Sequence, residues 1–176
     1  NVSGRRNLYL VFTGSSGSYV LNLAWFEFSS GSGSSNSYPN TSPSPAPVAN
    51  QPLPPVDGST IFNNWNKAMV YNGVSAKTYF YLAQRTTITR IMNYHWNNGN
   101  GSPAGTIGIK TSNGMAVGSW STIGTSGTGG AQNVNWVALP NVTLEPGLYE
   151  ITDSEPNTWS QNTGSFGCGF SMIWGR

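Results

Sequence analysis

A break in composition between Ser29 and Asp57 constrains the architecture of this chain more than any other feature. These residues are mostly Ser, Gly, Pro, Asn and Ala, and no charged residue occurs before Asp57. On either side the chain is rich in aromatic and β-branched residues. A stretch of this composition buries too little apolar surface to offset the entropy lost on ordering it. We therefore predict a linker, flexible in its Gly/Ser half and extended in its Pro-rich half, in preference to a long loop inside one domain.

The linker, residues 29–57, divides the chain into two units of unequal size. Residues 58–176 are numerous enough for one domain with its own hydrophobic core. Residues 1–28 are too few to form a core without disulfides or a metal, so we expect them to be the C-terminal part of a larger module. The first residue is not Met and no signal-peptide pattern follows it, so we expect Asn1 to be an internal start within a longer protein.

Patterns typical of β-strands dominate residues 58–176. Short β-prone runs are separated by turn sequences such as Asn72-Gly73 and Asn113-Gly114, and helical periodicity is absent apart from one short helical turn expected within Thr60–Lys67. The pattern predicts an all-β fold, a β-sandwich or jelly roll, preceded by an incomplete β-hairpin and the linker. The expected strands are Ala68–Tyr71, Lys77–Leu82, Thr86–Trp96, Gly105–Thr111, Ala116–Ser121, Asn133–Leu139, Leu148–Thr152 and Phe170–Trp174.

Charge and composition exclude several classes of protein. Charged residues make up 8% of the chain, the net charge is +2, and the basic residues are too scattered to form the patch that nucleic acid requires. No apolar run reaches the ~18 residues that would predict a membrane span. Cys168 is the single cysteine, which excludes an intrachain disulfide and predicts a buried, inert thiol. Low charge with abundant Asn, Ser, Thr and Gly suits a secreted, extracellular bacterial β-protein.

The N-terminal unit contains a specific motif. Its two β-prone runs contain Gly4, Asn7-Leu8-Tyr9-Leu10-Val11-Phe12 and Gly14, followed by Asn22-Leu23-Ala24-Trp25-Phe26-Glu27-Phe28. This motif resembles the last two strands of family 6 carbohydrate-binding modules. The resemblance implies a jelly-roll module continuing upstream, polysaccharide ligands such as xylan and β-glucans, and a sugar-binding role for Asn22. Ala24 departs from the acidic or amide residue usual at its position, which argues against a nearby structural calcium.

The hairpin formed by residues 4–28 also has unpaired edges and uncovered apolar faces. Such edges tend to pair with other strands. We expect the hairpin to pair with the missing upstream strands, with a second copy of the chain, or with a sheet of the second unit.

Two segments of the second unit combine aromatic rings with polar side chains directly after a predicted strand. They are Asn93–Gly101 and Asp153–Asn162. Sugar recognition uses this combination, because aromatic faces stack on the C–H face of a pyranose while amides and carboxylates bind its hydroxyls. The candidate sugar-binding residues are Tyr94, His95, Trp96, Asn98, Trp120, Asp153, Trp159 and Asn162, together with Asn22, and Trp136 is a further platform.

An alternative interpretation assigns the same rings to the core. Strand alternation places Ile88, Met92, Tyr94 and Trp96 on one face, and that face can be the buried one. Residues 61–173 are also similar to an accessory domain of bacterial secreted multidomain proteins, with the segments YHWNNG and DS…TWS.N. That similarity implies an extracellular, modular, β-rich protein without indicating an activity.

Catalysis and metal binding are not expected. A glycosidase needs two carboxylates about 5–10 Å apart across a cleft, and neighbours on one loop, such as Asp153 and Glu155, rarely flank a bond. His95 is the only histidine, and no serine occupies a nucleophile elbow. Asp153 and Glu155 can offer oxygen ligands to one structural calcium ion, although solvated carboxylates explain them more simply.

These features together predict a non-catalytic polysaccharide-binding module of a secreted bacterial carbohydrate-active protein. A weak binder tethered to an enzyme raises the local concentration of that enzyme at its substrate, so we expect the parent protein to include a glycoside hydrolase. The alternative is a structural or adhesive extracellular module that self-assembles by strand exchange through the N-terminal hairpin. Retention by polysaccharides and concentration-dependent assembly would distinguish the two.

Overall fold

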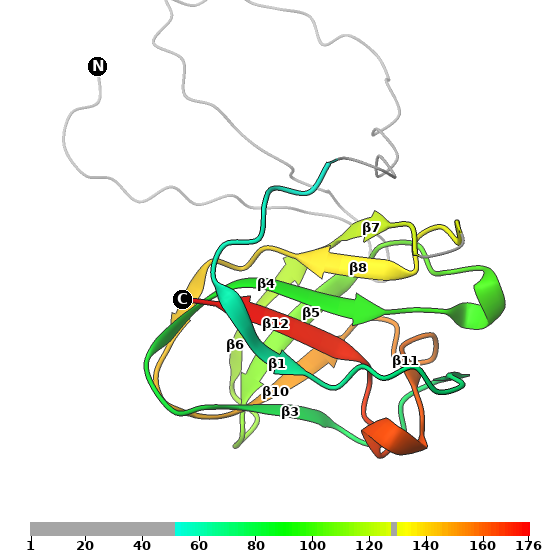
Figure 1. Cartoon of the computed structure of the whole chain (residues 1–176). Helices are drawn as coiled ribbons and strands as arrows, with labels where there is room; N and C mark the ends of the chain where they lie inside the picture. The colour runs from blue at the N-terminus through cyan, green and yellow to red at the C-terminus, as the bar shows by residue number, and fades with distance from the viewer. Residues whose placement is uncertain (1–51, 128–129) are drawn as a thin grey trace, which may run out of the picture. The chain divides into compact units, whose positions relative to one another are not determined.

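The described part of the chain is a β-sandwich. The computed structural model describes residues 52–127 and 130–176, which form two antiparallel sheets packed face to face and a small two-stranded sheet (Figure 1). The all-β sandwich expected from the short strand patterns is therefore confirmed. The predictions made for residues 1–28, and for most of the linker 29–57, lie outside the described residues.

The larger sheet has six strands and contains both the first and the last strand of the sandwich. Its order is β1–β12–β4–β8–β7, and β9 pairs with the beginning of β4. All its pairings are antiparallel. The strands are β1 (Ser59–Asn63), β4 (Thr86–Tyr94), β7 (Ile123–Thr125), β8 (Asn135–Ala138), β9 (Val142–Leu144) and β12 (Ser171–Gly175).

The smaller sheet has four strands in the order β3–β10–β5–β6, and β11 pairs with β2 separately. Among the described residues the helical elements are two short 3-10 turns, and no helix is long and apolar enough to cross a bilayer. The strands of the four-stranded sheet are β3 (Thr78–Leu82), β5 (Thr106–Thr111), β6 (Ala116–Ser121) and β10 (Gly147–Asp153). The separate pair consists of β2 (Tyr71–Asn72) and β11 (Ser160–Gln161). The 3-10 turns are η1 (Asn97–Gly99) and η2 (Thr163–Ser165).

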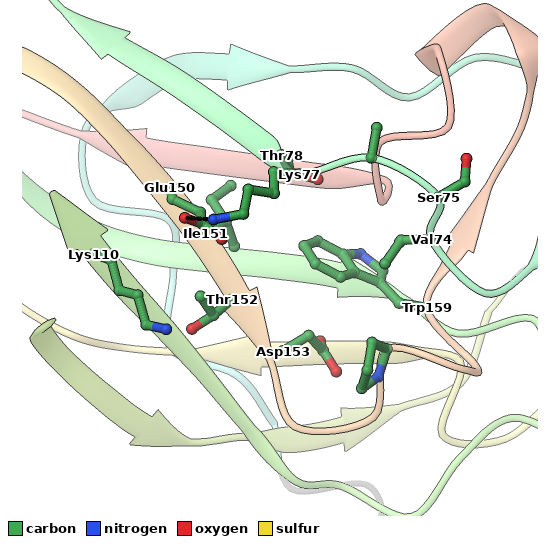
Figure 2. A pocket seen from close by; sticks show the side chains of 12 residues that line it. Val74, Ser75, Lys77, Thr78, Lys110, Glu150, Ile151, Thr152, Asp153 and Trp159 are labelled. Atoms are coloured by element: carbon green, nitrogen blue, oxygen red, sulfur yellow. Dashed lines mark hydrogen bonds and ion pairs between the residues drawn. The ribbon is translucent and has the colours of Figure 1, made fainter. Parts of the chain in front are cut away.

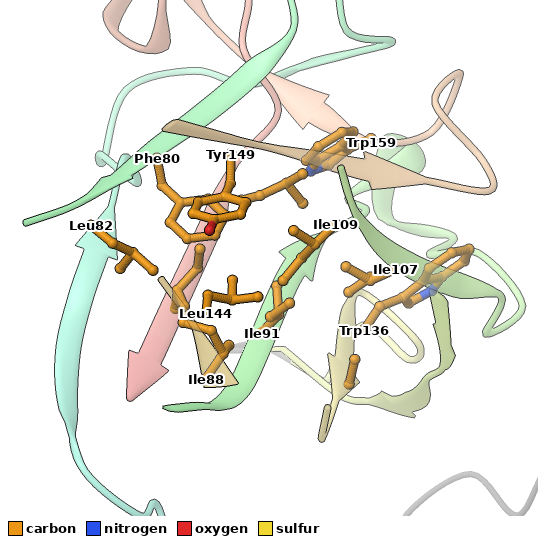
Figure 3. Close-up of a cluster of buried hydrophobic side chains, with 13 residues drawn as sticks. Phe80, Leu82, Ile88, Ile91, Ile107, Ile109, Trp136, Leu144, Tyr149 and Trp159 are labelled. Carbon is orange, nitrogen blue, oxygen red and sulfur yellow. The ribbon is translucent and has the colours of Figure 1, made fainter. Parts of the chain in front are cut away.

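Side-chain alternation places the hydrophobic core between the two sheets. In β3 the side chains of Thr78, Phe80 and Leu82 face the interior, while Tyr79 and Tyr81 face solvent. Buried side chains from both sheets meet in one continuous cluster (Figure 3). The cluster consists of Phe80, Leu82, Ile88, Ile91, Ile107, Ile109, Trp136, Ala138, Leu144, Tyr149, Ile151, Trp159 and Ile173.

A β-bulge divides β4 into two halves with different alternation. Ile88 and Ile91 are both fully buried, although strict alternation would place them on opposite faces. Along β12, Trp174 pairs with Arg90 and the next residue, Gly175, pairs with Ile88, so one residue of β4 is left over. An extra residue of this kind shifts the side chains that follow it to the other face.

The bulge decides which side chains of the second half of β4 enter the core. Asn93 and His95 point inward and are fully buried, whereas Met92, Tyr94 and Trp96 lie on the outer face and are half-buried. The interpretation that placed Ile88 on one face with the last three is therefore wrong. The bulge leaves Tyr94 and Trp96 available at the surface.

The strand predictions are confirmed for β3, β4, β5, β6, β8, β10 and β12, with ends that differ by a few residues. The helical turn expected within Thr60–Lys67 is wrong, because Ser59–Asn63 forms β1 along the edge of β12. Pairing with a strand more than a hundred positions away outweighs local preference there. Three further strands, β7, β9 and β11, were not expected and are all two or three residues long.

The last residues of the predicted linker lie against the sandwich. The Pro54 carbonyl accepts a hydrogen bond from Arg90 Nη2, and the Asp57 carboxylate pairs with Arg176 Nε at 2.8 Å. The Arg90 guanidinium also lies over the Trp174 ring, 6.0 Å from its centroid, and burial lowers the pKa of Arg90. The folded body therefore includes residues that precede the boundary expected at residue 58.

Candidate functional site

An open groove of about 530 Å³ lies at the end of β4, on the outer face of the six-stranded sheet. Residues 65–70 form one side of the groove, and Tyr94 and Trp96 form part of its base. Asn135 of β8 and Phe170, which precedes β12, complete the lining with Gly127. The volume lies within the range of about 300–1,000 Å³ that is usual for small-molecule sites.

Aromatic rings from separate parts of the chain meet in this groove. The centroids of the Trp65 and Tyr94 rings are 5.0 Å apart with an interplanar angle of 53°, and Trp65 also lies 6.4 Å from Phe170. Trp65, Tyr94 and Trp96 are half-buried, so each ring has part of its surface exposed. Tilted rings at these distances hold one another in place, which favours a preformed aromatic surface.

The segment that contains Trp65 is fastened to the sheet through its amide side chains. Asn64 Nδ2 donates to the Gly169 carbonyl at 2.9 Å, and its Oδ1 accepts from Ser171 N at 2.7 Å. Asn66 and Asn162 exchange two amide hydrogen bonds, of 3.0 and 2.6 Å. These bonds position Trp65 over the end of β4 without using the strand pairing of the sheet.

The groove also contains polar groups. Trp65 Nε1 is buried and has no hydrogen-bond partner within residues 52–127 and 130–176. Burial raises the pKa of the Tyr94 phenol, so its hydroxyl stays protonated at any ordinary pH. Asn135 donates one hydrogen bond from Nδ2 to the Ser126 carbonyl at 3.2 Å, and the Lys67 ammonium is exposed at the rim. The groove therefore offers donors and acceptors beside its rings.

A network of polar side chains lies inside the sandwich, behind the outer face that forms the groove. Asp153 Oδ2 accepts hydrogen bonds from Asn93 Nδ2 at 2.7 Å and from His95 Nε2 at 3.1 Å. His95 Nδ1 lies 2.9 Å from Thr158 Oγ1, and Ser171 Oγ donates to Asn93 Oδ1 at 2.7 Å. The side chains of His95 and Asp153 are wholly shielded from solvent. The network ties β4 to β10, β12 and the loop after β10.

Two buried indole rings complete this internal frame. The Trp136 ring stacks on His95 with centroids 3.9 Å apart, and its Nε1 donates to the Ser102 carbonyl at 3.0 Å. The Trp159 ring is 3% exposed, and its Nε1 donates to the Phe170 carbonyl at 3.0 Å. Both indole N–H groups are thus satisfied inside the protein, and neither ring offers a face to a ligand.

The structure separates the candidate residues into two groups. Tyr94 and Trp96 line the groove. Asn98, two residues after Trp96, is exposed in η1. The structure corrects the expectation that the other candidates of the two loops reach a ligand, because the interior of the protein takes up their side chains. The buried candidates are His95, Asp153, Trp159 and Asn162, and Trp136 is buried with them.

The remaining candidates lie elsewhere. Trp120 belongs to the edge strand β6, where it packs against the core and over Gly118. Asn22 lies outside the described residues. The description of Asp153 as a solvated carboxylate is wrong, since its oxygens bond to Asn93, to His95 and to the backbone N–H of Glu155.

Sequence reasoning missed Trp65, which contributes the ring opposite Tyr94. The signal was present, because Trp65 stands among Asn63, Asn64 and Asn66 in the same mixture of ring and amides that marked the other two segments. The helical turn predicted within Thr60–Lys67 would not place Trp65 beside a strand end, where the other two segments lie. Phe170 lies in a predicted strand and is not among the predicted site residues.

Comparisons of the chain with protein-family models, with curated proteins and with solved structures found no match.

Within the described residues, no group of three or more His, Cys, Asp or Glu side chains is arranged to hold a metal ion. Cys168 is half-buried, less than expected; burial raises the pKa of its thiol, and Sγ donates to the Lys77 carbonyl at 3.2 Å. The functional proposal therefore rests on the residues that line the groove and on their geometry.

Proposed function

We propose that the described domain is a non-catalytic polysaccharide-binding module of a secreted carbohydrate-active protein. The observation that supports this proposal is the open groove in which Trp65, Tyr94 and Trp96 present half-exposed rings beside amide groups. Indole and phenol rings stack on the apolar faces of pyranose rings, and the amides bind sugar hydroxyls at their edges. The rings stand on a rigid sheet and on a segment fastened to it, so little ordering is needed when a ligand binds.

The shape of the groove favours part of a polymer over a small free sugar. The groove is open to solvent, and Met69 at its rim is 75% exposed, so a bound chain can continue past Met69 beyond the lined region. Binding of this kind is weak at a single site. It becomes useful through proximity, because a tethered binder keeps the attached protein close to the polymer.

Affinity electrophoresis of the full chain in gels containing xylan or a soluble β-glucan, with pull-down on cellulose and chitin, tests the proposal. We expect at least one polysaccharide to retain the protein, and we expect Trp96→Ala to weaken that retention about tenfold, or ~1.4 kcal/mol. Loss of one stacking face explains this size of effect.

Tyr81→Ala is the matched control, because Tyr81 is an exposed ring on the opposite sheet, 66% accessible. It should leave retention unchanged, and the melting temperatures of both variants should match that of the unmodified chain within a few degrees. Retention by none of the polymers, or equal loss in the two variants, would contradict the proposal.

A further inference from the structure

A second hollow, of about 450 Å³, lies beside the smaller sheet, where β3 and β10 separate (Figure 2). The pairing of β3 with β10 stops at Thr78 and Ile151, whereas β5 accompanies β10 as far as Asp153. Residues 74–77 diverge from the sheet at this point. The space between this segment and the end of β10 is the hollow.

The charged side chains that line this hollow differ in whether they have an ion-pair partner. Lys77 Nζ lies 2.9 Å from Glu150 Oε2, and the hydrogen bond and charge of Glu150 raise the pKa of Lys77. The two charges of this pair cancel. Lys110 lies across from Glu150 in the strand register, and no carboxylate lies within 4 Å of its ammonium in the described part of the chain.

The other acidic residue that lines the hollow does not pair with Lys110. Asp153 has its carboxylate wholly buried and committed to Asn93, His95 and the backbone. Among the charged side chains of the lining, Lys77 and Glu150 form an ion pair, and Lys110 is left without an ion-pair partner in the described residues. Figure 2 shows the Lys110 side chain extending from β5 along Thr152.

The uncharged lining resembles a sugar subsite more than a simple ion site. Ser75 and Thr152 are the hydroxyl-bearing residues of the lining, and Val74 and Pro156 form an apolar wall. A small inorganic ion would leave most of a space of this size unfilled. A pyranose ring offers hydroxyls to the first group and C–H surface to the second.

We propose that this hollow binds a uronate residue of an acidic polysaccharide, with the sugar carboxylate paired to Lys110 and the ring against the apolar wall. The inference rests on the proposed function of the domain as a polysaccharide binder. It adds a second site, on the other sheet from the aromatic groove, and a chemical class of ligand. An ion pair at this partly open position should weaken as salt rises.

Isothermal titration of the full chain with tri-galacturonic acid tests the inference, with its methyl-esterified form as the uncharged ligand of equal size. We expect the acid to bind and the ester to bind at least tenfold more weakly. Lys110→Gln should weaken binding of the acid about tenfold. Lys67→Gln, which removes a similar exposed ammonium at the aromatic groove, should change it less than twofold.

The outcomes separate this inference from the proposed function. Trp96→Ala should weaken retention by neutral polymers about tenfold and leave binding of the acid intact. If neutral polymers retain the protein but the acid does not bind, the second site is wrong and the aromatic groove stands. The inference is also overturned if Trp96→Ala, and not Lys110→Gln, removes binding of the acid, or if acetate competes as strongly as the trisaccharide.

Discussion

At the scale of single residues, the same chemistry serves two different purposes in this domain. His95, Asp153 and Asn162 have the donors and acceptors of a sugar site, but other protein groups occupy them. His95 and Asp153 bond to each other, and Asn162 bonds to Asn66 and to the backbone N–H of Ser165. Tyr94 and Trp96, their neighbours in sequence, remain at the surface. The two groups cannot be told apart by residue type. Their division depends on burial, which composition does not encode.

The internal network should account for a large share of the domain's stability. Asp153→Ala removes the acceptor of Asn93 and His95 and leaves both buried without a partner, which should cost about 3 kcal/mol in the free energy of unfolding. Urea denaturation followed by tryptophan fluorescence measures this loss. Glu155→Ala, two residues away and exposed, should change stability by less than ~0.5 kcal/mol. Similar midpoints for the two variants would show that the network is dispensable.

At the scale of elements, local sequence predicted which segments are strands and failed where distant pairing decides. Regular alternation in β3 and β5 identified them, and turn residues bounded them. β1 exists because β12 lies beside it, and the bulge in β4 is defined by the register of β12. Neither feature leaves a signal within its own segment. The bulge in turn determines the site, because it directs Tyr94 outward.

Packing between the segment before β12 and the loop after β10 leaves no room for an extra methyl group. A Cβ on Gly169 would overlap the ring of Trp159, which is itself buried. We expect Gly169→Ala to lower the free energy of unfolding by about 3 kcal/mol through overpacking. Gly114→Ala is the comparison, because its Cβ would meet nothing and only its positive φ would cost ~1 kcal/mol. Equal losses in thermal denaturation would contradict this account.

At the scale of the whole molecule, the sandwich class followed from strand number and spacing, but the positions of its surfaces did not. Trp65 and Tyr94 are 29 positions apart in the numbering and meet only because residues 64–66 are fastened across the sheet. Lys110 and Glu150 are brought together by the pairing of β5 with β10. Sites assembled in this way require the complete topology, which single-sequence patterns do not supply.

The contacts of Pro54 and Asp57 predict where the independently stable unit begins. A chain of residues 52–176 should unfold in one transition at nearly the melting temperature of the full chain, because its buried core is complete. A chain of residues 58–176 lacks the Pro54 and Asp57 contacts and should melt about 4 °C lower, equivalent to ~1 kcal/mol. Calorimetry compares the two. Identical transitions would mean that residues 52–57 only rest on the surface.

The antiparallel pairing of the first and last strands has a mechanical consequence. Gly58 lies directly against Gly175, so the first and last strands begin and end at one corner of the sandwich (Figure 1). Phe170, which lines the aromatic groove, precedes the other end of β12. Tension applied at Gly58 and Gly175 would peel β1 away from β12 one hydrogen bond after another instead of shearing them together. A joint loaded in this direction yields at lower force than one in which the same hydrogen bonds are sheared together.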